Sequence, residues 1–510
     1  MDFDQPNLTL ESTPEDEKEV KYITEVLKKD FNLYETPEES KKRQEILISL
    51  KKCVKEAVKN LYKSKGKSDE EAENAGGGVF PFGSYRLGIA GPGDDIDVLC
   101  IAPATDTKDA NNKCERSELF DEMEKQLRKL PEISQILPVP KATVPIIKLI
   151  YKNIPIDILV ASVSFKSIDD NFKLDDDNVL KNCCKECILS LNGCRVTNAI
   201  FDSLPKGKTE DFRLTLRAIK LWAKKRGIYS NAMGYPGGVA WAILVAKVCQ
   251  LYPKCKANIL IRKFFEIYSK WDWEKPVQIN EIKKEVDFTC PVTVWDKDAI
   301  SKEDHCPFYI ITPAFPAQNT NAGTGPILKT VMIEEFIIFK EYTSNININD
   351  INCKYTWKGL FKGGISLFEG YKYFLEIDIL SMNKADFKSW DGFVESQLRK
   401  LIFLFNDIPQ IKLRPFSNAY TVKDTTYPFS RTYLYGISFV DPEKLKIKNN
   451  DKVINLREPV TKFITDLDKK RDKKNEKNLR INFKSINELP YEILKKQKIS
   501  LLINFSLFAV

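Results

Sequence analysis

The stretch FPFGSYRLGIAGPGDDIDVLCIAP, residues 80–103, decides the fold that we expect for this chain. It places a Gly-Ser turn, Gly83-Ser84, before a strand that begins with Asp95 and Asp97. Side chains two apart on a strand share a face, so both carboxylates point the same way. A Gly-Ser turn that opens a helix offers backbone N–H groups and a hydroxyl to phosphate. Together these features predict a site for a divalent cation and a nucleoside triphosphate.

A third carboxylate lies in IPIDILV, residues 154–160. The alternation there puts isoleucines on one face of a strand and Asp157 on the other. A lone carboxylate amid isoleucines is costly unless it is paired or binds a cation. Three such carboxylates suit Mg²⁺, which also takes phosphate oxygens. In a two-metal displacement we expect Asp157 to hold the ion that activates the attacking hydroxyl.

The acidic motif at residues 94–97 has another interpretation. Short acidic motifs recur by chance, and this one taken alone is equally typical of a solvated turn. The Gly-Ser turn that precedes it favours the metal site.

Four basic residues recur on one face of an otherwise apolar helical stretch: Arg213, Arg217, Lys220 and Lys224. A helix this apolar is largely buried, so we expect its basic face to line a cleft that holds anions or acidic side chains. Internal ion pairing, for example with the acids of residues 169–177, is the alternative, and it applies most to the two arginines.

A candidate base pocket follows this helix. Tyr229 and Asn231 come at its end, and Gly237-Gly238-Val239 begins the next helix. Paired glycines let the backbone approach a ligand closely. The Asn231 amide offers a donor and an acceptor, as the edge of adenine requires. Tyr229 is equally consistent with a place in the core.

Length and composition narrow the class of protein. At 510 residues the chain is too long for one core, and about three domains are expected. The net charge of +8 is a mild excess, which permits a polyanionic partner. The only histidine is His305, so acid–base chemistry must use carboxylates or metal-bound groups. No apolar run reaches the roughly 20 residues that span a bilayer, so we expect no membrane contact.

The predicted fold class is α+β and multidomain: a mixed-sheet palm with helices, a helical middle domain and a ferredoxin-like last domain. Helices are expected at 18–62, 180–192, 211–226, 239–252 and 259–273, with a loop at 63–78 and an extended linker at 307–316. Strands at 371–380, 410–416, 433–440 and 479–483 alternate with helices at 386–406 and 453–470, a plan that many RNA-recognition domains use. We expect domains at 1–175, 176–345 and 346–495 and a tail at 496–510.

The chain resembles the eukaryotic nuclear poly(A) polymerases, a branch of the DNA polymerase β-like nucleotidyltransferases. Besides residues 80–103, the stretches that carry the resemblance are VPIIKLIYKNIPIDILVA, SLNGCRVTNAI, FRLTLRAIKLWAKKRGIYSNAMGYPGGVAWAILVAKVCQLYP, FFEIYSKWDWEKPV, ITPAFPAQN and KADFKSWDGFVESQLRKLI. They span about residues 80 to 402 in the family's order. At residues 91–94, Gly-Pro-Gly-Asp replaces a segment that usually carries a Thr-Lys or similar pair.

The resemblance implies template-independent addition of AMP from ATP to an RNA 3′ end, with two Mg²⁺ or Mn²⁺ ions and release of pyrophosphate. It implies a monomer in the nucleus, with cleavage and polyadenylation proteins as partners. By position, the metal ligands are Asp95, Asp97 and Asp157. The residues expected around ATP are Phe82, Gly83, Ser84, Asp157, Lys220, Tyr229, Asn231, Gly238 and Val239. Lys148 and Asn192 match positions near the nucleotide or the RNA end.

Two other functions stay open. A uridylyltransferase would keep the palm and change the nucleotide, but the match around Asn231 argues against it. An RNA-binding scaffold without activity would be expected to lose a metal ligand, whereas all three aspartates are present with Ser84 and Lys220. A sugar-nucleotide transferase also uses Asp-x-Asp, but the Gly-Ser turn and the third aspartate fit it poorly.

Overall fold

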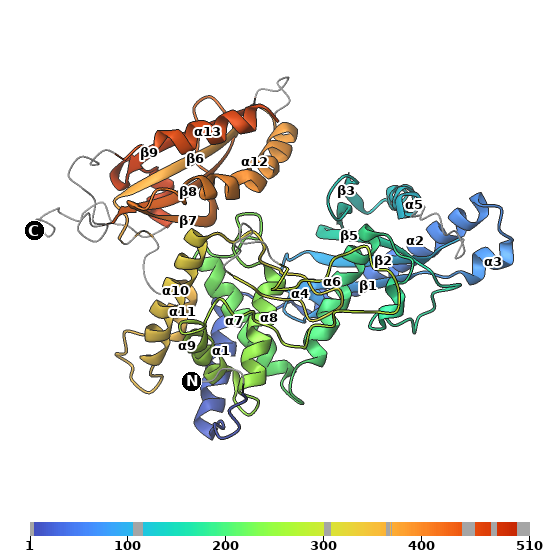
Figure 1. Ribbon diagram of the computed structural model, residues 1–510, viewed down its shortest axis with the longest axis horizontal. Coiled ribbons are helices and arrows are strands. Elements are labelled where there is room, and N and C mark those ends of the chain that lie inside the picture. Colours follow the sequence, from blue (N-terminus) through green and yellow to red (C-terminus); the bar gives the residue numbers. More distant parts are fainter. Residues whose placement is uncertain are drawn as a thin grey trace, which may run out of the picture.

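A computed structural model describes residues 5–105, 116–299, 308–363, 368, 370–440, 454–470 and 477–496. Two lobes that each contain a sheet lie apart from one another, and a helical body below the β6–β9 lobe connects them (Figure 1). The basic run of Lys469, Lys470, Arg471, Lys473 and Lys474 has two interpretations, a solvated loop, which is the more typical one, and an import signal. The last three residues of that run, His305 and residues 497–510 lie outside the described residues. No described helix combines the length and apolarity that crossing a bilayer requires.

The first sheet has five strands in the order β1-β2-β5-β4-β3. Their bounds are Gly78–Phe82, Ile96–Pro103, Ile154–Val163, Ile146–Tyr151 and Ile133–Val139. β2 and β5 are parallel, and the other neighbours are antiparallel. β4 and β5 form a hairpin that turns at Lys152 and Asn153, both with positive φ.

Helices cover both faces of this sheet. α2 (Pro37–Ser64) and α5 (Arg116–Arg128) pack on one face, where Ile96, Val98, Ile156 and Ile158 are fully buried. α6 (Lys185–Asp202) packs on the other face, with Leu99 and Ala161. The period-2 alternation therefore placed the faces of β2 and β5 correctly, and it aims their aspartates toward the side of α6.

Three expectations for local structure were wrong. The loop expected at 63–78 contains helix α3 (Asp69–Asn74), which begins with a capping box between Ser68 and Glu71. The helix expected at 180–192 is present but its bounds were wrong, because a 3-10 turn, η1 (Asp177–Leu180), comes first and α6 begins at Lys185 and continues to Asp202. The segment expected as a linker is extended but packed: Phe308 is fully buried and stacks on Trp273 at 3.9 Å between ring centroids.

The helical body surrounds an aromatic core. It contains α7 (Thr209–Lys225), α8 (Gly238–Leu251), α9 (Ala257–Tyr268), α10 (Pro326–Ser344) and α11 (Trp357–Lys362). The first helix of the chain, α1 (Pro14–Lys29), packs on α9 and α11. Trp222 on α7 packs edge-on against Trp241 on α8 and against Phe265 on α9, which fixes the rotation of α7 about its axis.

The second sheet has the order β7-β8-β6-β9, the strand order of a ferredoxin-like fold. The strands are β6 (Tyr373–Ser381), β7 (Ile411–Tyr420), β8 (Phe429–Phe439) and β9 (Lys477–Ser485). α12 (Lys384–Leu404) and α13 (Arg457–Asp468) cover one face. The other face packs on Phe368 and on α14 (Tyr491–Lys496). The six elements predicted from the sequence are all present.

Candidate nucleotide and metal site

Three carboxylates meet at the start of two parallel strands. Asp97 on β2 pairs in register with Asp157 on β5. Asp95, Asp97 and Asp157 each place a carboxylate oxygen within 4.8 Å of the others, and no other such group occurs among the described residues. Burial, and then the charges of Asp95 and Asp157, raise the pKa of Asp97 to about 7. Burial and Asp157 also raise the pKa of Asp95. The ionised forms of Asp95 and Asp97 are thus disfavoured, and a divalent cation held by the three carboxylates would remove that penalty.

Lys148 lies beside this cluster on β4. It pairs in register with Asp157, and its Nζ donates a hydrogen bond to Asp157 Oδ2 at 2.8 Å. Its side chain is about half exposed. Neither Lys148 nor Asp157 lines the adjoining cleft. The structure thus places Lys148 against a predicted metal ligand, and its contact with a nucleotide or RNA stays a prediction.

The Gly-Ser turn lies directly over the carboxylates. Phe82 ends β1 opposite Asp97, and α4 (Gly83–Arg86) follows at once. Gly83 has a φ of +62°, and a Cβ at this position would run into the Asp97 carboxylate. Only glycine combines that backbone conformation with so close an approach. The turn therefore brings the Ser84 hydroxyl and the first N–H groups of α4 next to the aspartates.

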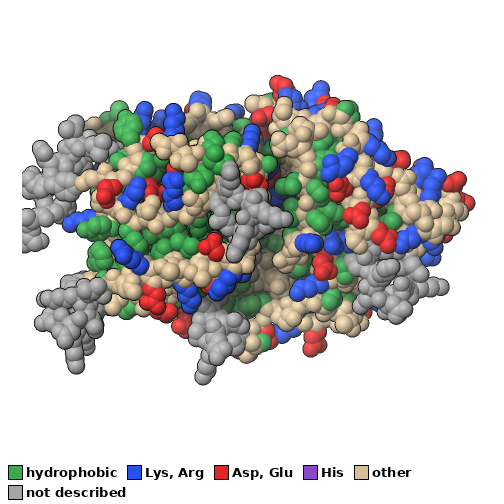
Figure 2. Space-filling model, turned by 90° about the horizontal axis from the view of Figure 1, so that it is seen from above, with side chains coloured by type: hydrophobic (Ala, Val, Ile, Leu, Met, Phe, Trp, Pro, Cys, Tyr) green, Lys and Arg blue, Asp and Glu red, His purple; other side chains and the backbone are tan. Residues whose placement is uncertain are grey.

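A cleft of about 680 Å³ opens from this point toward the helical body. It is large enough for a nucleotide. Figure 2 shows a hollow between the two lobes that contain the sheets. Besides Asp95 and Asp97, the predicted residues that line the cleft are Phe82, Gly83, Ser84, Asn192, Lys220, Tyr229, Asn231, Gly238 and Val239. Their roles in binding stay predictions, but segments far apart in sequence converge here.

Two details of the cleft favour a polar ligand with a flat group. Asn192 Oδ1 is buried and has no hydrogen-bond partner among the described residues, which is costly for an amide oxygen. A Cβ on Gly238 would lie 3.0 Å from the Tyr229 hydroxyl, so a side chain there would crowd the ring. Gly237 lies next to Asn231, where a Cβ would make an ordinary van der Waals contact at 3.4 Å. The glycines keep this end of the cleft open beside Tyr229 and Asn231.

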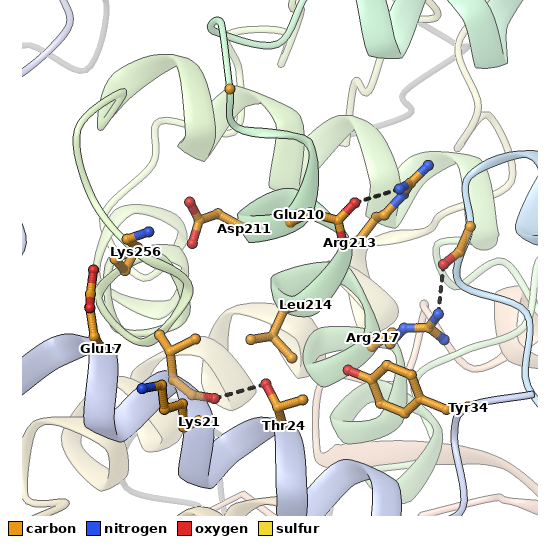
Figure 3. A pocket seen from close by; sticks show the side chains of 13 residues that line it. Glu17, Lys21, Thr24, Tyr34, Glu210, Asp211, Arg213, Leu214, Arg217 and Lys256 are labelled. Carbon is orange, nitrogen blue, oxygen red and sulfur yellow. Dashed lines mark hydrogen bonds and ion pairs between the residues drawn. The ribbon is translucent and has the colours of Figure 1, made fainter.

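The basic face of α7 is divided between two surroundings. Arg213 Nε donates to Leu87 O at 3.0 Å, and Arg217 donates to Leu33 O at 2.9 Å and to Gly88 O at 2.6 Å. Both arginines line a second pocket of about 440 Å³ between α1 and α7 (Figure 3). The Arg217 guanidinium lies over the ring of Tyr34.

For the arginines, the expected cleft with anions or acidic side chains is a pocket that also holds Glu17, Glu210 and Asp211, and it is separate from the cleft beside Asp95 and Asp97. The partners of the arginines are internal, as the alternative supposed, but they are mainly backbone carbonyls rather than the acids of residues 169–177. The segment after α4 forms no regular structure, so its carbonyls need donors from elsewhere. Of the acids, Asp177 pairs with Arg195 and Lys283, and Asp170 pairs with Lys51.

The lysines at the other end of the face do line the cleft. In the part of the chain that the structure describes, neither Lys220 nor Lys224 forms an ion pair with a carboxylate. Their ammonium groups lie 5.9 and 5.4 Å from the centroid of the Tyr229 ring. Burial, and then the charge of Lys224, lower the pKa of Lys220 to about 8. A cation kept from water without a salt bridge is suited to a ligand phosphate.

Several residues that line the cleft were missed from the sequence. They are Asp94, Leu189, Val196, Thr197, Ile200, Ala240, Thr312, Gln318 and Thr320. Asn192, Val196 and Ile200 recur every four residues on α6, so helical periodicity from Asn192 was a signal for two of them. Thr312 comes from the packed extended segment and Gln318 follows it closely, and the Gln318 N–H donates to Thr312 Oγ1 at 2.8 Å. Only tertiary structure carries that segment to the cleft.

Comparison with known proteins agrees with this architecture. The first sheet and its carboxylates define the class, a nucleotidyltransferase domain. Residues 5–204 match the family model of the poly(A) polymerase nucleotidyltransferase domain. Residues 211–363 match the poly(A) polymerase central domain, and residues 366–428 match the poly(A) polymerase predicted RNA binding domain. The chain belongs to the poly(A) polymerase family.

Individual relatives are similar over most of the chain. A poly(A) polymerase of Dictyostelium discoideum is 37% identical over 440 residues, which cover 85% of this chain and 51% of that protein. Nuclear poly(A) polymerase 1 of Arabidopsis thaliana is 35% identical over 80% of this chain and 55% of its own length. Poly(A) polymerase PAPalpha of Candida albicans is 37% identical over 78% of this chain and 69% of its own length. The chain thus spans about half the length of the first two of these relatives.

Solved structures are less similar. A cytoplasmic RNA terminal U-transferase matches 68% of this chain and 99% of its own, with a TM-score of 0.45 and 15% identity. That similarity is too low to bear on the choice of nucleotide.

Proposed function

We propose that this chain is a template-independent polynucleotide adenylyltransferase, which transfers AMP from ATP to the 3′ end of RNA and releases pyrophosphate. The observation that carries the proposal is the convergence of Asp95, Asp97 and Asp157 beside a cleft that also holds Lys220. Membership in the poly(A) polymerase family supports the choice of reaction.

Each part of the cleft has a proposed task. Asp95, Asp97 and Asp157 would hold two Mg²⁺ or Mn²⁺ ions, which when bound supply positive charge to the triphosphate and activate the attacking hydroxyl. The Ser84 hydroxyl and the N–H groups of α4 donate to phosphate oxygens. Lys220 adds a positive charge, which stabilises the negative charge that grows on the leaving pyrophosphate.

The base and the RNA end are placed by other residues. Asn231 is proposed to read the edge of adenine, with Tyr229, Gly238 and Val239 around the nucleotide and the Phe82 ring beside it. Gly193 on α6 leaves room for the Phe82 ring, because a Cβ at position 193 would lie 3.0 Å from that ring. Lys148, next to Asp157, is proposed to lie near the 3′ hydroxyl, and Asn192 near either group.

The location, partners and domain bounds are proposals of the same kind. Three Arabidopsis relatives are named nuclear poly(A) polymerases, which supports a nuclear location. Proteins of the cleavage and polyadenylation complex would select the RNA, and the chain would act as a monomer. The predicted bounds at 175, 345 and 495 stay a prediction. The predicted bounds assign α6 to the middle domain and α1 to the palm. Because α6 packs on β5 and α1 packs on α9, we propose instead that α6 belongs with the first sheet and α1 with the helical body.

The test is an incubation of the purified chain with oligo(A), Mg²⁺ and each of the four nucleoside triphosphates separately. We expect extension with ATP and little with UTP, CTP or GTP, because the site must satisfy the adenine edge. Equal extension with UTP would contradict adenylate specificity and favour a uridylyltransferase. No extension with any nucleotide, under conditions where the chain binds oligo(A), would favour the scaffold.

A further inference from the structure

The ferredoxin-like lobe contacts the nucleotide cleft through a bulge in β7. β7 pairs with β8 in register as far as Pro415 opposite Tyr435, and again from Ala419 opposite Tyr433. Residues 416–418 between them face a single residue of β8, so the pairing is interrupted there. A bulge of this kind frees polar groups from the ladder and re-aims side chains.

The freed groups bind the segment that follows α7. The Ser417 N–H donates to Gly227 O at 2.9 Å, and Ser417 Oγ accepts from the Tyr229 N–H at 3.3 Å. Asn418 Nδ2 donates to Lys224 O at 3.0 Å. Two of the three residues held in this way, Lys224 and Tyr229, line the cleft.

The fit between the two segments is close. Gly227 has a φ of +68°, and a Cβ there would run into Asn418 Oδ1. That Cβ would also lie 3.5 Å from the Cα of Phe416, a residue that is fully buried. Position 227 therefore requires glycine twice over, for its backbone conformation and for the approach of β7.

Further contacts extend this interface in both directions. The Tyr235 hydroxyl donates to Pro415 O at 2.7 Å, and Arg414 donates to Arg226 O at 3.1 Å. Arg226 and Arg414 share the carboxylate of Glu335, which is fully buried, each at 2.7 Å. A buried ionic triad with short bonds resists displacement, since separating the charges would leave one unpaired. These contacts of Arg414 and Pro415 thus fix the strand directly before the bulge.

We propose that Ser417 and Asn418 are positioning residues for the nucleotide: from the ferredoxin-like lobe they fix Tyr229 and the last turn of α7, with Lys224, against the cleft. The inference rests on the proposed binding of ATP in that cleft. It gives this lobe a part in ATP use that is separate from any contact with RNA, because neither side chain lines the cleft itself.

A purely structural role makes a different prediction. If the bulge only holds two lobes together, its loss lowers the melting temperature and leaves the kinetics unchanged at temperatures where the chain is folded. A positioning role raises the KM for ATP under those same conditions, because Tyr229 and Lys224 lose their register with the nucleotide.

The test compares Ser417→Ala with the wild type in the full chain. Ser417→Ala removes the acceptor for the Tyr229 N–H and keeps the backbone bond to Gly227. We expect the KM for ATP, and the dissociation constant for ATP measured by calorimetry, to rise about fivefold, as loss of one hydrogen bond allows. The KM for oligo(A) should stay unchanged. Ser417→Thr, which keeps the hydroxyl, should restore ATP binding.

Two further variants keep the test decisive. Ser438→Ala, on β8 opposite Lys412, is the matched control and should change none of these constants. If Ser417→Ala does not fold, Asn418→Ala removes only the bond to Lys224 O and should raise the KM for ATP about threefold. Unchanged ATP constants in whichever variant folds would overturn the inference and leave the proposed function standing. A wild-type chain that neither binds ATP nor incorporates AMP would instead refute the proposed function, and the inference with it.

Discussion

Arg213 and Arg217 occupy the first half of the basic face of α7, and Lys220 and Lys224 occupy the second half. The four residues share a helix and a sign of charge. The arginines form hydrogen bonds within the protein: Arg217 alone donates to the carbonyls of Leu33, Gly88 and Ala90. The lysines face the cleft and meet no carboxylate partner among the described residues.

The difference follows from the chemistry of the two side chains. A guanidinium presents several donors in a fixed fork, so it can satisfy several carbonyls of one irregular segment at once. An ammonium on a flexible stem is a point charge, which serves phosphate without needing fixed geometry. Spacing predicts which residues share a face, and it does not predict their partners. The predictions below test this division, from the largest effect on activity to the smallest.

Asp97→Ala tests whether the lysines serve a metal-dependent site. Asp97 lines the same cleft as Lys220, and the positive charge of Lys220 opposes the upward shift of the Asp97 pKa. We expect AMP incorporation to fall by about a thousandfold or more, as for loss of a metal ligand. The melting temperature of the chain without metal should hold or rise, because a crowded like charge is removed. AMP incorporation by Asp97→Ala at the wild-type rate would contradict the proposal that Asp97 is a metal ligand.

Lys220→Ala should show most clearly that the lysines of the basic face of α7 differ in role from its arginines. We expect kcat/KM for ATP to fall about a hundredfold, because a buried charge on the triphosphate is lost. The melting temperature should change little, since no ion pair within the described residues depends on Lys220. The measurements are ATP kinetics and thermal unfolding of the same preparation. An unchanged dependence on ATP would assign Lys220 to structure, like the arginines.

The pH dependence of ATP use gives a second measure of Lys220. Its pKa is lowered to about 8 by burial and by Lys224, so the side chain loses its charge as pH rises through that value. Only the protonated form attracts phosphate, so the KM for ATP should rise about tenfold between pH 7 and pH 9. The rise should be smaller in Lys220→Arg, whose charge persists. Parallel pH profiles in the two proteins would contradict this role.

Arg217→Ala should act mainly on stability. The change leaves carbonyls of Gly88 and Leu33 without donors and removes the contact with Tyr34, so we expect a loss of about 3 kcal/mol of unfolding free energy. Activity measured well below the melting temperature should fall only severalfold, through the segment next to the Gly-Ser turn. Glu210→Ala, which removes an exposed partner of Arg213, is the matched control and should leave the melting curve unchanged. If Arg217→Ala were as stable as the wild type but bound ATP much more weakly, Arg217 would serve the nucleotide rather than the fold, contrary to this account.

Sequence reasoning predicted that Asp95, Asp97 and Asp157 lie close together, because local patterns determine their placement. That they hold metal ions stays a prediction. The alternation in β2 and β5 sets which face each aspartate occupies, and a parallel register then brings Asp97 beside Asp157. The positive φ of Gly83 explains why a glycine precedes the serine. The ferredoxin-like order was also predictable, because its six elements alternate in period and are separated by clear breaks.

What sequence reasoning missed depends on contacts between distant segments. Arg217 meets carbonyls near residues 33 and 90, and no spacing within α7 encodes that meeting. The bulge of β7 that holds Tyr229 joins residues almost 190 positions apart. The packed segment that contains Thr312 was predicted to be a linker because its prolines break regular structure, although Phe308 and Ile310 within it are fully buried.

The central claim is that this cleft moves the α-phosphoryl group of ATP, with its nucleoside, to an RNA 3′ hydroxyl. The most direct measurement incubates the full chain with Mg²⁺, oligo(A) and ATP labelled at either the α- or the γ-phosphorus. Label from the α position should enter the RNA in a phosphodiester at its 3′ end, and label from the γ position should appear in pyrophosphate. Label from the γ position in the RNA, or no transfer from the α position, would contradict the account.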